Sequence, residues 1–179
     1  MSKNCRHPPP FINPMTVVTK VDLETGEIKK RPCIDMSRCL NKLVPPVKST
    51  LDSLSVCEKM LMAGDFQSVF DLENMYFHIQ LHPDARQFFG FSLPSDNGGK
   101  DYFEFTVMCY GYTAAVSTVT RLVKPLKTYL NQLGIRFHIY IDDGRVVAQT
   151  QEECNFKAQL TRACFQLAGF NNCLNHFVL

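Results

Sequence analysis

The sequence of 179 residues contains no tryptophan and no long, uninterrupted apolar run. Because a membrane-spanning helix needs about 20 mostly apolar residues, we expect no span and no membrane partner. Residues 1–14 lack the apolar segment of a signal peptide, so secretion is not expected either. With 45% hydrophobic and 11% aromatic residues, the chain has the material for a folded core. These features predict an intracellular protein, either cytoplasmic or nuclear.

The eight cysteines form no Cys-x-x-Cys pair and have no histidine at zinc-finger spacing. A disulfide framework needs an oxidising compartment, which the missing leader argues against. We therefore predict free thiols that act as small hydrophobic residues and bind no metal.

The small net charge of +2 hides an uneven distribution, because residues 1–50 are basic and residues 51–179 are acidic. Residues 15–21 and 28–34 look like two strands around a turn at 24–27, which predicts a hairpin carrying Lys29, Lys30 and Arg31. A basic ribbon on an acidic remainder suits an anionic ligand near a metal site. An ordinary solvated surface is the alternative.

The rest of the chain mixes the two periodicities, which predicts an α+β fold with a small antiparallel sheet backed by helices. The run Pro8-Pro9-Pro10, together with Pro14, predicts an extended entry arm. The expected strands are 68–72, 88–93, 102–107, 137–141 and 145–148, and the expected helices are 51–63, 113–130 with a kink or break at Pro125, and 151–168.

The last helix has a clear start signal and an apolar stripe. Thr150 and Glu153 match a capping box, and Gly169 suits the helix end. The stripe at helical spacing consists of Phe156, Leu160, Cys164 and Leu167, which we expect to face the core.

Two adjacent carboxylates, Asp142 and Asp143, precede Gly144 between two strand-like runs. Asp-Gly in that context is a strong hairpin signal, so the carboxylates are expected at a hairpin tip. Like charges there repel each other, a cation relieves the repulsion, and carboxylate oxygens suit Mg²⁺. Simple turn chemistry is the alternative. A second strand that ends in a carboxylate, Asp71, favours the metal site.

Four segments resemble motifs of reverse transcriptases, in the order of that family. Residues 140–143, Tyr-Ile-Asp-Asp, resemble the Tyr-x-Asp-Asp signature. Residues 70–79 are similar to the first catalytic motif, 31–41 to the fingers motif, and 102–111 to the segment that leads into the third motif. The resemblance covers roughly residues 12–179. The sequences Glu-Thr-Gly at 24–26 and Gly-Arg at 144–145 look most like a retrotransposon enzyme of the DIRS-like, tyrosine-recombinase class.

The resemblance implies a right-hand polymerase. Its fingers would comprise residues 1–50 and 79–114, and its palm 51–78 and 115–179, with helices on one face of the palm sheet. Because the sequence given stops at residue 179, we expect a polyprotein fragment without a thumb. Such a fragment would hold duplex weakly, since phosphate contacts supply much of the affinity for nucleic acid.

The resemblance also assigns a reaction and a metal site. Asp71 and Asp142, with Asp143 beside them, would hold two Mg²⁺ ions, which Mn²⁺ can replace. The implied reaction is the addition of dNTPs to a primer 3′-end on an RNA or DNA template.

Further residues take roles by the same resemblance, and each has a plainer alternative. Lys20 and Arg31 would contact the triphosphate, or be surface charges. Tyr76 would be the steric gate against a ribose 2′-hydroxyl, or pack in the core. The remaining assignments are Tyr110 and Gly111 near the nucleotide and His176 as a candidate general acid.

Two departures from the family pattern keep another function open. The proline of the third motif is replaced by Cys109, and Ala114-Ala115 stands where Ala-Pro is expected. The alternative is therefore a catalytically inactive reverse-transcriptase-like module that binds nucleic acid or protein. A palm-type nucleotidyl cyclase is a third interpretation, but it gives no reason for the hairpin that carries Arg31.

Overall fold

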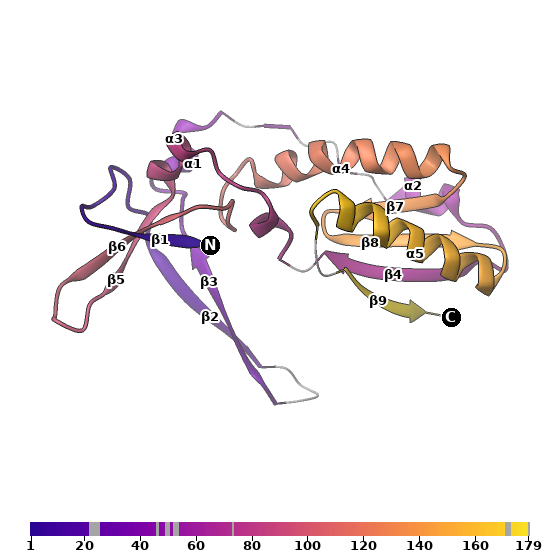
Figure 1. The fold of residues 1–179 in the computed structure, drawn as a ribbon, viewed down its shortest axis with the longest axis horizontal. Helices are drawn as coiled ribbons and strands as arrows, with labels where there is room; N and C mark the ends of the chain where they lie inside the picture. Colours follow the sequence, from indigo (N-terminus) through magenta and orange to yellow (C-terminus); the bar gives the residue numbers. More distant parts are fainter. Residues whose placement is uncertain are drawn as a thin grey trace. The chain divides into compact units, whose positions relative to one another are not determined.

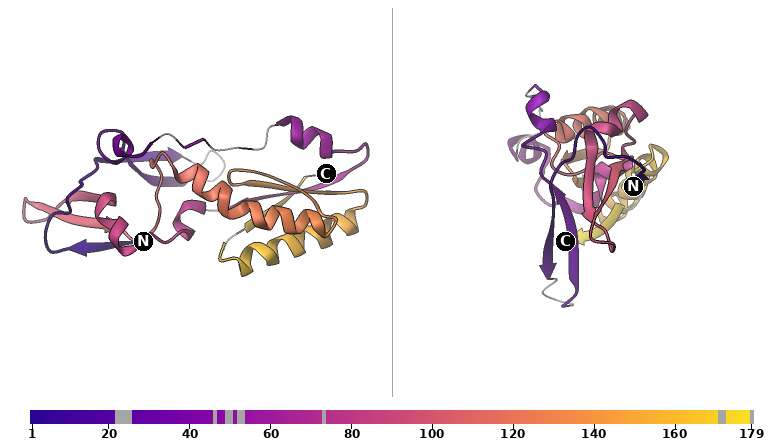
Figure 2. Two further views of the ribbon diagram at one scale, coloured as in Figure 1. Left: turned by 90° about the horizontal axis from the view of Figure 1, so that it is seen from above. Right: turned by 90° about the vertical axis from the view of Figure 1, so that its left-hand side faces the viewer.

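The computed structural model describes residues 1–21, 26–45, 47–48, 51, 54–72, 74–170 and 173–178. The side chains of Lys20, Lys29, Arg31, Leu54 and residues 173–178 lie outside that description. The chain divides into two compact units, which Figures 1 and 2 show in ribbon form. Residues 1–47 and 79–115 form unit 1, and residues 48–78 and 116–179 form unit 2. Each unit is thus built from two separate stretches of sequence.

The basic hairpin of unit 1 is confirmed. Strand β2 (Met15–Val21) pairs antiparallel with β3 (Ile28–Ile34) as a two-stranded ribbon (Figure 1). Its register sets Lys20 opposite Lys29 and Val18 opposite Arg31. Of the predicted turn, residues 24 and 25 lie outside the described part of the chain.

A strand that the sequence did not predict precedes the proline-rich arm. Strand β1 (Ser2–Cys5) pairs with β6 (Lys100–Phe105), which also pairs with β5 (Gly90–Pro94). The prolines begin only at residue 8, so Ser2–Cys5 keep their N–H donors for a sheet. This polar edge strand needs no apolar alternation, and Lys3 contributes an ion pair of 3.0 Å with Glu104.

The core of unit 1 lies against the β5–β6 hairpin. The rings of Phe103 and Phe105 pack on Phe91, and Phe89 meets Tyr112 edge-on. Short helices complete the unit: α1 (Leu40–Leu43), α3 (Pro83–Arg86) and the 3₁₀ turn η2 (Gln87–Phe89).

Unit 2 contains an antiparallel sheet in the order β7-β8-β4-β9. Its strands are β4 (Phe66–Leu72), β7 (Arg136–Tyr140), β8 (Asp143–Ala148) and β9 (Cys173–Val178). The β7–β8 hairpin is confirmed, but its turn is not the predicted Asp-Gly. Tyr140 pairs with Asp143, so the loop is Ile141–Asp142 and Gly144 lies inside β8.

Helix α4 (Ala115–Gln132) contains Pro125 and continues past it, so the predicted break does not occur. Helix α2 (Leu54–Met60) is shorter than the predicted 51–63, of which residues 52 and 53 lie outside the described chain. Just beyond it, the Asp65 carboxylate accepts a hydrogen bond of 2.7 Å from the Met62 N–H, in a turn that leads into β4.

Helix α5 (Gln151–Leu167) has the predicted cap, because the Thr150 hydroxyl accepts from the Glu153 N–H at 3.3 Å. The predicted buried stripe is wrong, since Phe156 is 66% exposed and Leu167 89% exposed. Phe165 is buried instead, with its ring 5.7 Å from that of Phe70. Two overlapping sets of residues in this helix satisfy helical spacing, and the set that contains Phe165 is the one that packs on the sheet. The buried stripe is Cys154, Ala158, Thr161 and Phe165.

None of the seven cysteines that the structure describes takes part in a disulfide. Cys57, Cys109 and Cys154 are buried, and burial raises the pKa of the Cys109 thiol to about 12. No helix in the described part of the chain is long and apolar enough to cross a membrane.

Candidate active site

The three predicted metal ligands come together at one end of the unit 2 sheet. Asp71, near the end of β4, is the cross-strand partner of Asp143, the first residue of β8. Asp142 lies in the loop directly before Asp143. Ligand oxygens from all three carboxylates lie within 4.8 Å of one another. A fully antiparallel β4–β8 pair brings residues about seventy positions apart into this cluster.

The loop that carries Asp142 is held by its backbone. The Leu72 N–H donates a hydrogen bond of 3.0 Å to the Asp142 carbonyl, which ties the loop to the end of β4. Ile141 has a φ of 58°, an unfavourable conformation for a β-branched residue. Strain of this kind is typical of functional loops, where the surrounding structure enforces it.

The electrostatics of the cluster favour a bound cation. Burial raises the pKa of the Asp142 carboxyl, and the negative charge of Asp143 raises it further. Asp71 and Asp142 are half-buried, while Asp143 is exposed. A divalent cation would relieve this repulsion, and carboxylate oxygens are the ligands that Mg²⁺ prefers. The donor set therefore fits magnesium.

Because Gly144 has no side chain, the ring of Phe70 in the core packs directly against its backbone, next to Asp143. A Cβ atom built on Gly144 would lie 2.3 Å from the ring of Phe70, which is far too close. Phe70 also stacks on Phe137, with ring centroids 5.9 Å apart. The glycine after the two aspartates thus serves packing rather than the turn, a role that the sequence did not reveal.

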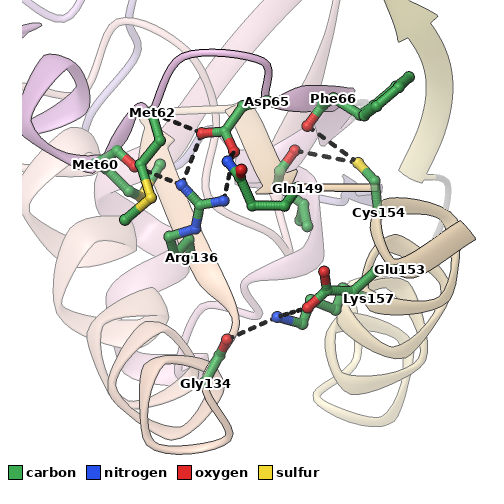
Figure 3. Close-up of polar contacts among 11 residues, drawn as sticks. Met60, Met62, Asp65, Phe66, Gly134, Arg136, Gln149, Glu153, Cys154 and Lys157 are labelled. Carbon is green, nitrogen blue, oxygen red and sulfur yellow. Dashed lines mark hydrogen bonds and ion pairs between the residues drawn. The ribbon is translucent and has the colours of Figure 1, made fainter. Parts of the chain in front are cut away.

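A second polar cluster, shown in Figure 3, was missed by the sequence analysis. Arg136 donates to both carboxylate oxygens of Asp65, at 2.7 and 2.5 Å, and to the Met60 carbonyl at 2.9 Å. The Met62 N–H donates a third hydrogen bond to the same carboxylate, and the Gln149 side-chain amide donates a fourth. The Asp65 side chain is only 3% exposed, and the hydrogen bonds from Arg136 lower its pKa to about 2. No motif or spacing in the sequence pairs these residues.

Two further predicted residues belong to unit 2. Tyr76 lies in the 3₁₀ turn η1 (Met75–His78) and is 8% exposed, the burial that its alternative, core packing, would give. His176 lies on β9 opposite Val69, two positions from Asp71 along β4; its side chain is outside the described part.

The other predicted residues, Lys20, Arg31, Tyr110 and Gly111, belong to unit 1. Lys20 lies on β2 and Arg31 on β3, and Tyr110 is 41% exposed. Gly111 has a φ of 97°, and a Cβ atom there would lie 2.1 Å from the Ile34 carbonyl oxygen. Only glycine fits this position.

Asn41 fixes the Gly111 turn, although the sequence analysis gave it no role. Its side-chain amide donates to the Gly111 carbonyl at 2.8 Å, and its side-chain oxygen accepts from the Thr113 N–H at 2.9 Å. The end of the fingers-like motif is thereby bonded to the third motif within unit 1. The signal available in the sequence was the position of Asn41 at the end of the 31–41 motif.

Comparison with known proteins gives consistent results. The chain is 25% identical over 147 residues to the enzymatic polyprotein of cassava vein mosaic virus, covering 80% of this chain and 20% of that protein. The fold is similar to that of a foamy viral protease-reverse transcriptase in complex with double-stranded DNA. That match has a TM-score of 0.75 and 20% identity, and covers 93% of this chain and 27% of the other.

A crystal structure of the prototype foamy virus protease-reverse transcriptase gives a TM-score of 0.72 at 16% identity, covering 96% of this chain and 21% of the other. The chain thus spans about a fifth of its curated relative, and both foamy viral likenesses show the fold. Residues 20–172 match the sequence profile of the family described as reverse transcriptase (RNA-dependent DNA polymerase). This match covers most of the sequence, and the chain belongs to the reverse transcriptase family.

Proposed function

We propose that this chain is the catalytic core of a reverse transcriptase that adds dNTPs to a primer 3′-end on an RNA or DNA template. The observation that carries the proposal is the convergence of Asp71, Asp142 and Asp143 within 4.8 Å at the end of two paired strands. Phosphoryl transfer by divalent metals needs carboxylates that converge from separate strands, and this sheet supplies them.

The three carboxylates are proposed as the ligands of two Mg²⁺ ions. When bound, such ions stabilise the negative charge that develops on the transferring phosphoryl group. The chain's own contribution is positioning: the Leu72 N–H holds the loop of Asp142, and the β4–β8 register holds Asp71 beside Asp143. A site fixed in this way loses little freedom when substrates bind.

The remaining predicted roles are part of the same proposal. Lys20 and Arg31 on the basic ribbon would contact the triphosphate, and Tyr110 beside the rigid Gly111 turn would lie near the nucleotide. Tyr76 is proposed as the gate against a 2′-hydroxyl and His176 as the general acid for pyrophosphate.

We assign unit 1 as fingers and unit 2 as palm. The boundaries of the two units lie close to the four ranges predicted from the sequence, which supports this assignment. The viral polyprotein relative suggests that the chain is one part of a longer polyprotein of a reverse-transcribing element that works in the cytoplasm or nucleus. The DIRS-like retrotransposon origin stays a prediction.

The test is primer extension on poly(rA)·oligo(dT) with dTTP and Mg²⁺. The parent chain is compared with Asp142→Asn, Asp71→Asn and the control Asp96→Asn in an exposed loop. We expect incorporation by the parent and the control, and none by the two site variants, because an amide ligates Mg²⁺ poorly. Incorporation by Asp142→Asn at the parental rate would refute the metal site.

A folded parent that binds primer–template but incorporates nothing at any metal concentration would select the alternative, an inactive binding module. Fluorescence anisotropy with a labelled primer–template, run beside the extension assay, separates the two functions. Turnover of NTPs without a primer would instead indicate a cyclase.

A further inference from the structure

The sheet of unit 2 carries two arginines on the same face as Asp143, and their surroundings differ. Arg136 and His138 lie two residues apart on β7 and therefore on the same face. The register places Arg136 opposite Val147 and His138 opposite Arg145 on β8. Since strand residues two apart share a face, Arg145 lies on the same face as Asp143, two residues further along β8. Its partner on β4 is Val69, two residues before Asp71.

Arg136 is fully used within the protein. It contacts both oxygens of Asp65 and the Met60 carbonyl, and its side chain is 23% exposed (Figure 3). This arginine braces the sheet at the end away from the carboxylate cluster.

Arg145 is not used in this way. Its hydrogen-bond contact is with the Cys57 thiol, at 3.9 Å, and a thiol is a weak acceptor. In the described part of the chain it makes no ion pair with a carboxylate. A half-buried guanidinium with several donors left over can still bind a carboxylate or a phosphate, the groups whose geometry its planar fork matches.

We propose that Arg145 binds a backbone phosphate of the primer strand near its 3′-end. The inference rests on the proposed function, in which the primer 3′-hydroxyl reaches the carboxylate cluster. Arg145 lies two residues beyond Asp143, roughly 7 Å along the strand, so the phosphates on the 5′ side of the primer terminus would come within reach of its side chain. Arginine recognises phosphate by bidentate, charge-assisted hydrogen bonds.

The position of Arg145 favours the primer over the triphosphate. It lies in the body of β8 rather than at the loop of Asp142, and its neighbours on the adjacent strands are Val69 and His138. A polyanion that starts at the cluster and follows β8 would come within reach of the exposed part of this guanidinium, which lies beside Cys57 of α2. Its charge also offsets the repulsion between that polyanion and the nearby aspartates.

The experiment measures equilibrium binding of a labelled primer–template by fluorescence anisotropy, in Mg²⁺ without dNTP. Four modified primers are used, and each carries one neutral methylphosphonate at a different one of the first four linkages from the 3′-end. The proteins are the parent, Arg145→Gln, Arg145→Lys, Cys57→Ser and the control Arg162→Gln, whose side chain is exposed on α5.

For the parent, we expect one neutral linkage to weaken binding about tenfold. Arg145→Gln should bind the natural primer about tenfold more weakly and show no further loss at that linkage. The slope of log Kd against log salt concentration should fall by about 0.9, the value for one phosphate contact. Arg145→Lys should restore the slope, and Cys57→Ser and Arg162→Gln should behave as the parent.

Equal sensitivity of the parent and Arg145→Gln to every linkage would overturn the inference while leaving the polymerase assignment intact. An increase in the KM for dTTP with unchanged primer binding would also overturn it, because the guanidinium would then serve the triphosphate. If the parent bound no primer–template, the proposed function would fail and the inference with it. Thermal melting of each variant checks that the fold is preserved.

Discussion

Arg136 at the start of β7 is bonded to Asp65, which directly precedes β4, although β8 lies between these two strands. The pair therefore clamps three strands together at the end of the sheet that is distant from the carboxylate cluster. Because the Asp65 side chain is only 3% exposed, its bonds with Arg136 are partly shielded from solvent. Removing one partner of such a buried pair destabilises the fold far more than removing one partner of an exposed ion pair, because the other charge is left without its partner.

We predict that Asp65→Asn lowers the free energy of unfolding by about 2–3 kcal/mol, since it leaves the Arg136 guanidinium without a counter-charge. Urea denaturation followed by circular dichroism measures the change. Glu153→Gln is the matched control, because the Glu153–Lys157 pair of 2.8 Å is partly exposed and should contribute less than about 1 kcal/mol. Equal losses for both variants would contradict the clamp.

The same carboxylate predicts a pH dependence. Asp65 has a pKa of about 2 in the folded protein, below its ordinary value of 3.8. A lowered folded-state pKa means that the stabilisation is complete above about pH 4 and is lost as the pH falls toward 2. The parent should therefore lose more stability than Asp65→Asn between pH 4 and 2. If the two proteins lost the same stability between pH 4 and 2, the Asp65 carboxylate would not be the titrating group.

Gly144→Ala tests the close approach of β8 to the core. The added methyl group would collide with the ring of Phe70, so the ring or the strand must move. Overpacking of this kind destabilises by about 1–3 kcal/mol, and here it also shifts the neighbouring Asp143. We expect a lower melting temperature and reduced primer extension. Gly99→Ala is the control, since a Cβ there meets nothing within 4 Å. An unchanged melting temperature for Gly144→Ala would contradict this packing.

The sequence predicted most elements and the residues of the cluster, for identifiable physical reasons. Runs of β-favouring residues and the Thr150 cap are local signals, and the Asp71 and Asp142 segments lie in recognisable motifs. Local signals do not reveal which of two helical stripes the sheet accepts, so the buried face of α5 was assigned wrongly. Long-range pairs such as Asp65 with Arg136 have no local signal at all.

The corrected face of α5 gives a paired prediction. Phe165→Ala should lower the free energy of unfolding by about 3–5 kcal/mol, because it removes a fully buried ring that contacts Phe70, Phe137 and Phe170. Phe156→Ala removes a ring that is 66% exposed and should change the free energy by about 0.5 kcal/mol or less. Chemical denaturation of both variants provides the measurement. The opposite ranking would restore the stripe predicted from the sequence.

Asp142→Asn should separate stability from function. Burial and the charge of Asp143 raise the pKa of Asp142, so its ionised form is disfavoured in the folded state. For a carboxyl with a raised folded-state pKa, this penalty is present at neutral pH and disappears below about pH 4. In EDTA at pH 7, Asp142→Asn should therefore melt at a higher temperature than the parent, and the difference should vanish in acid.

Magnesium should reverse that order. At about ten times its Kd, a ligand bound only by the folded protein adds about 1.4 kcal/mol of stability. The parent should gain this amount, whereas Asp142→Asn, with one ligand lost, should gain little. Melting curves with and without Mg²⁺ test both halves of the prediction, and Asp96→Asn should follow the parent. A parent that melts at the same temperature in EDTA and in Mg²⁺, while Asp142→Asn shows no stabilisation in EDTA, would mean that the three carboxylates are neither strained nor a metal site.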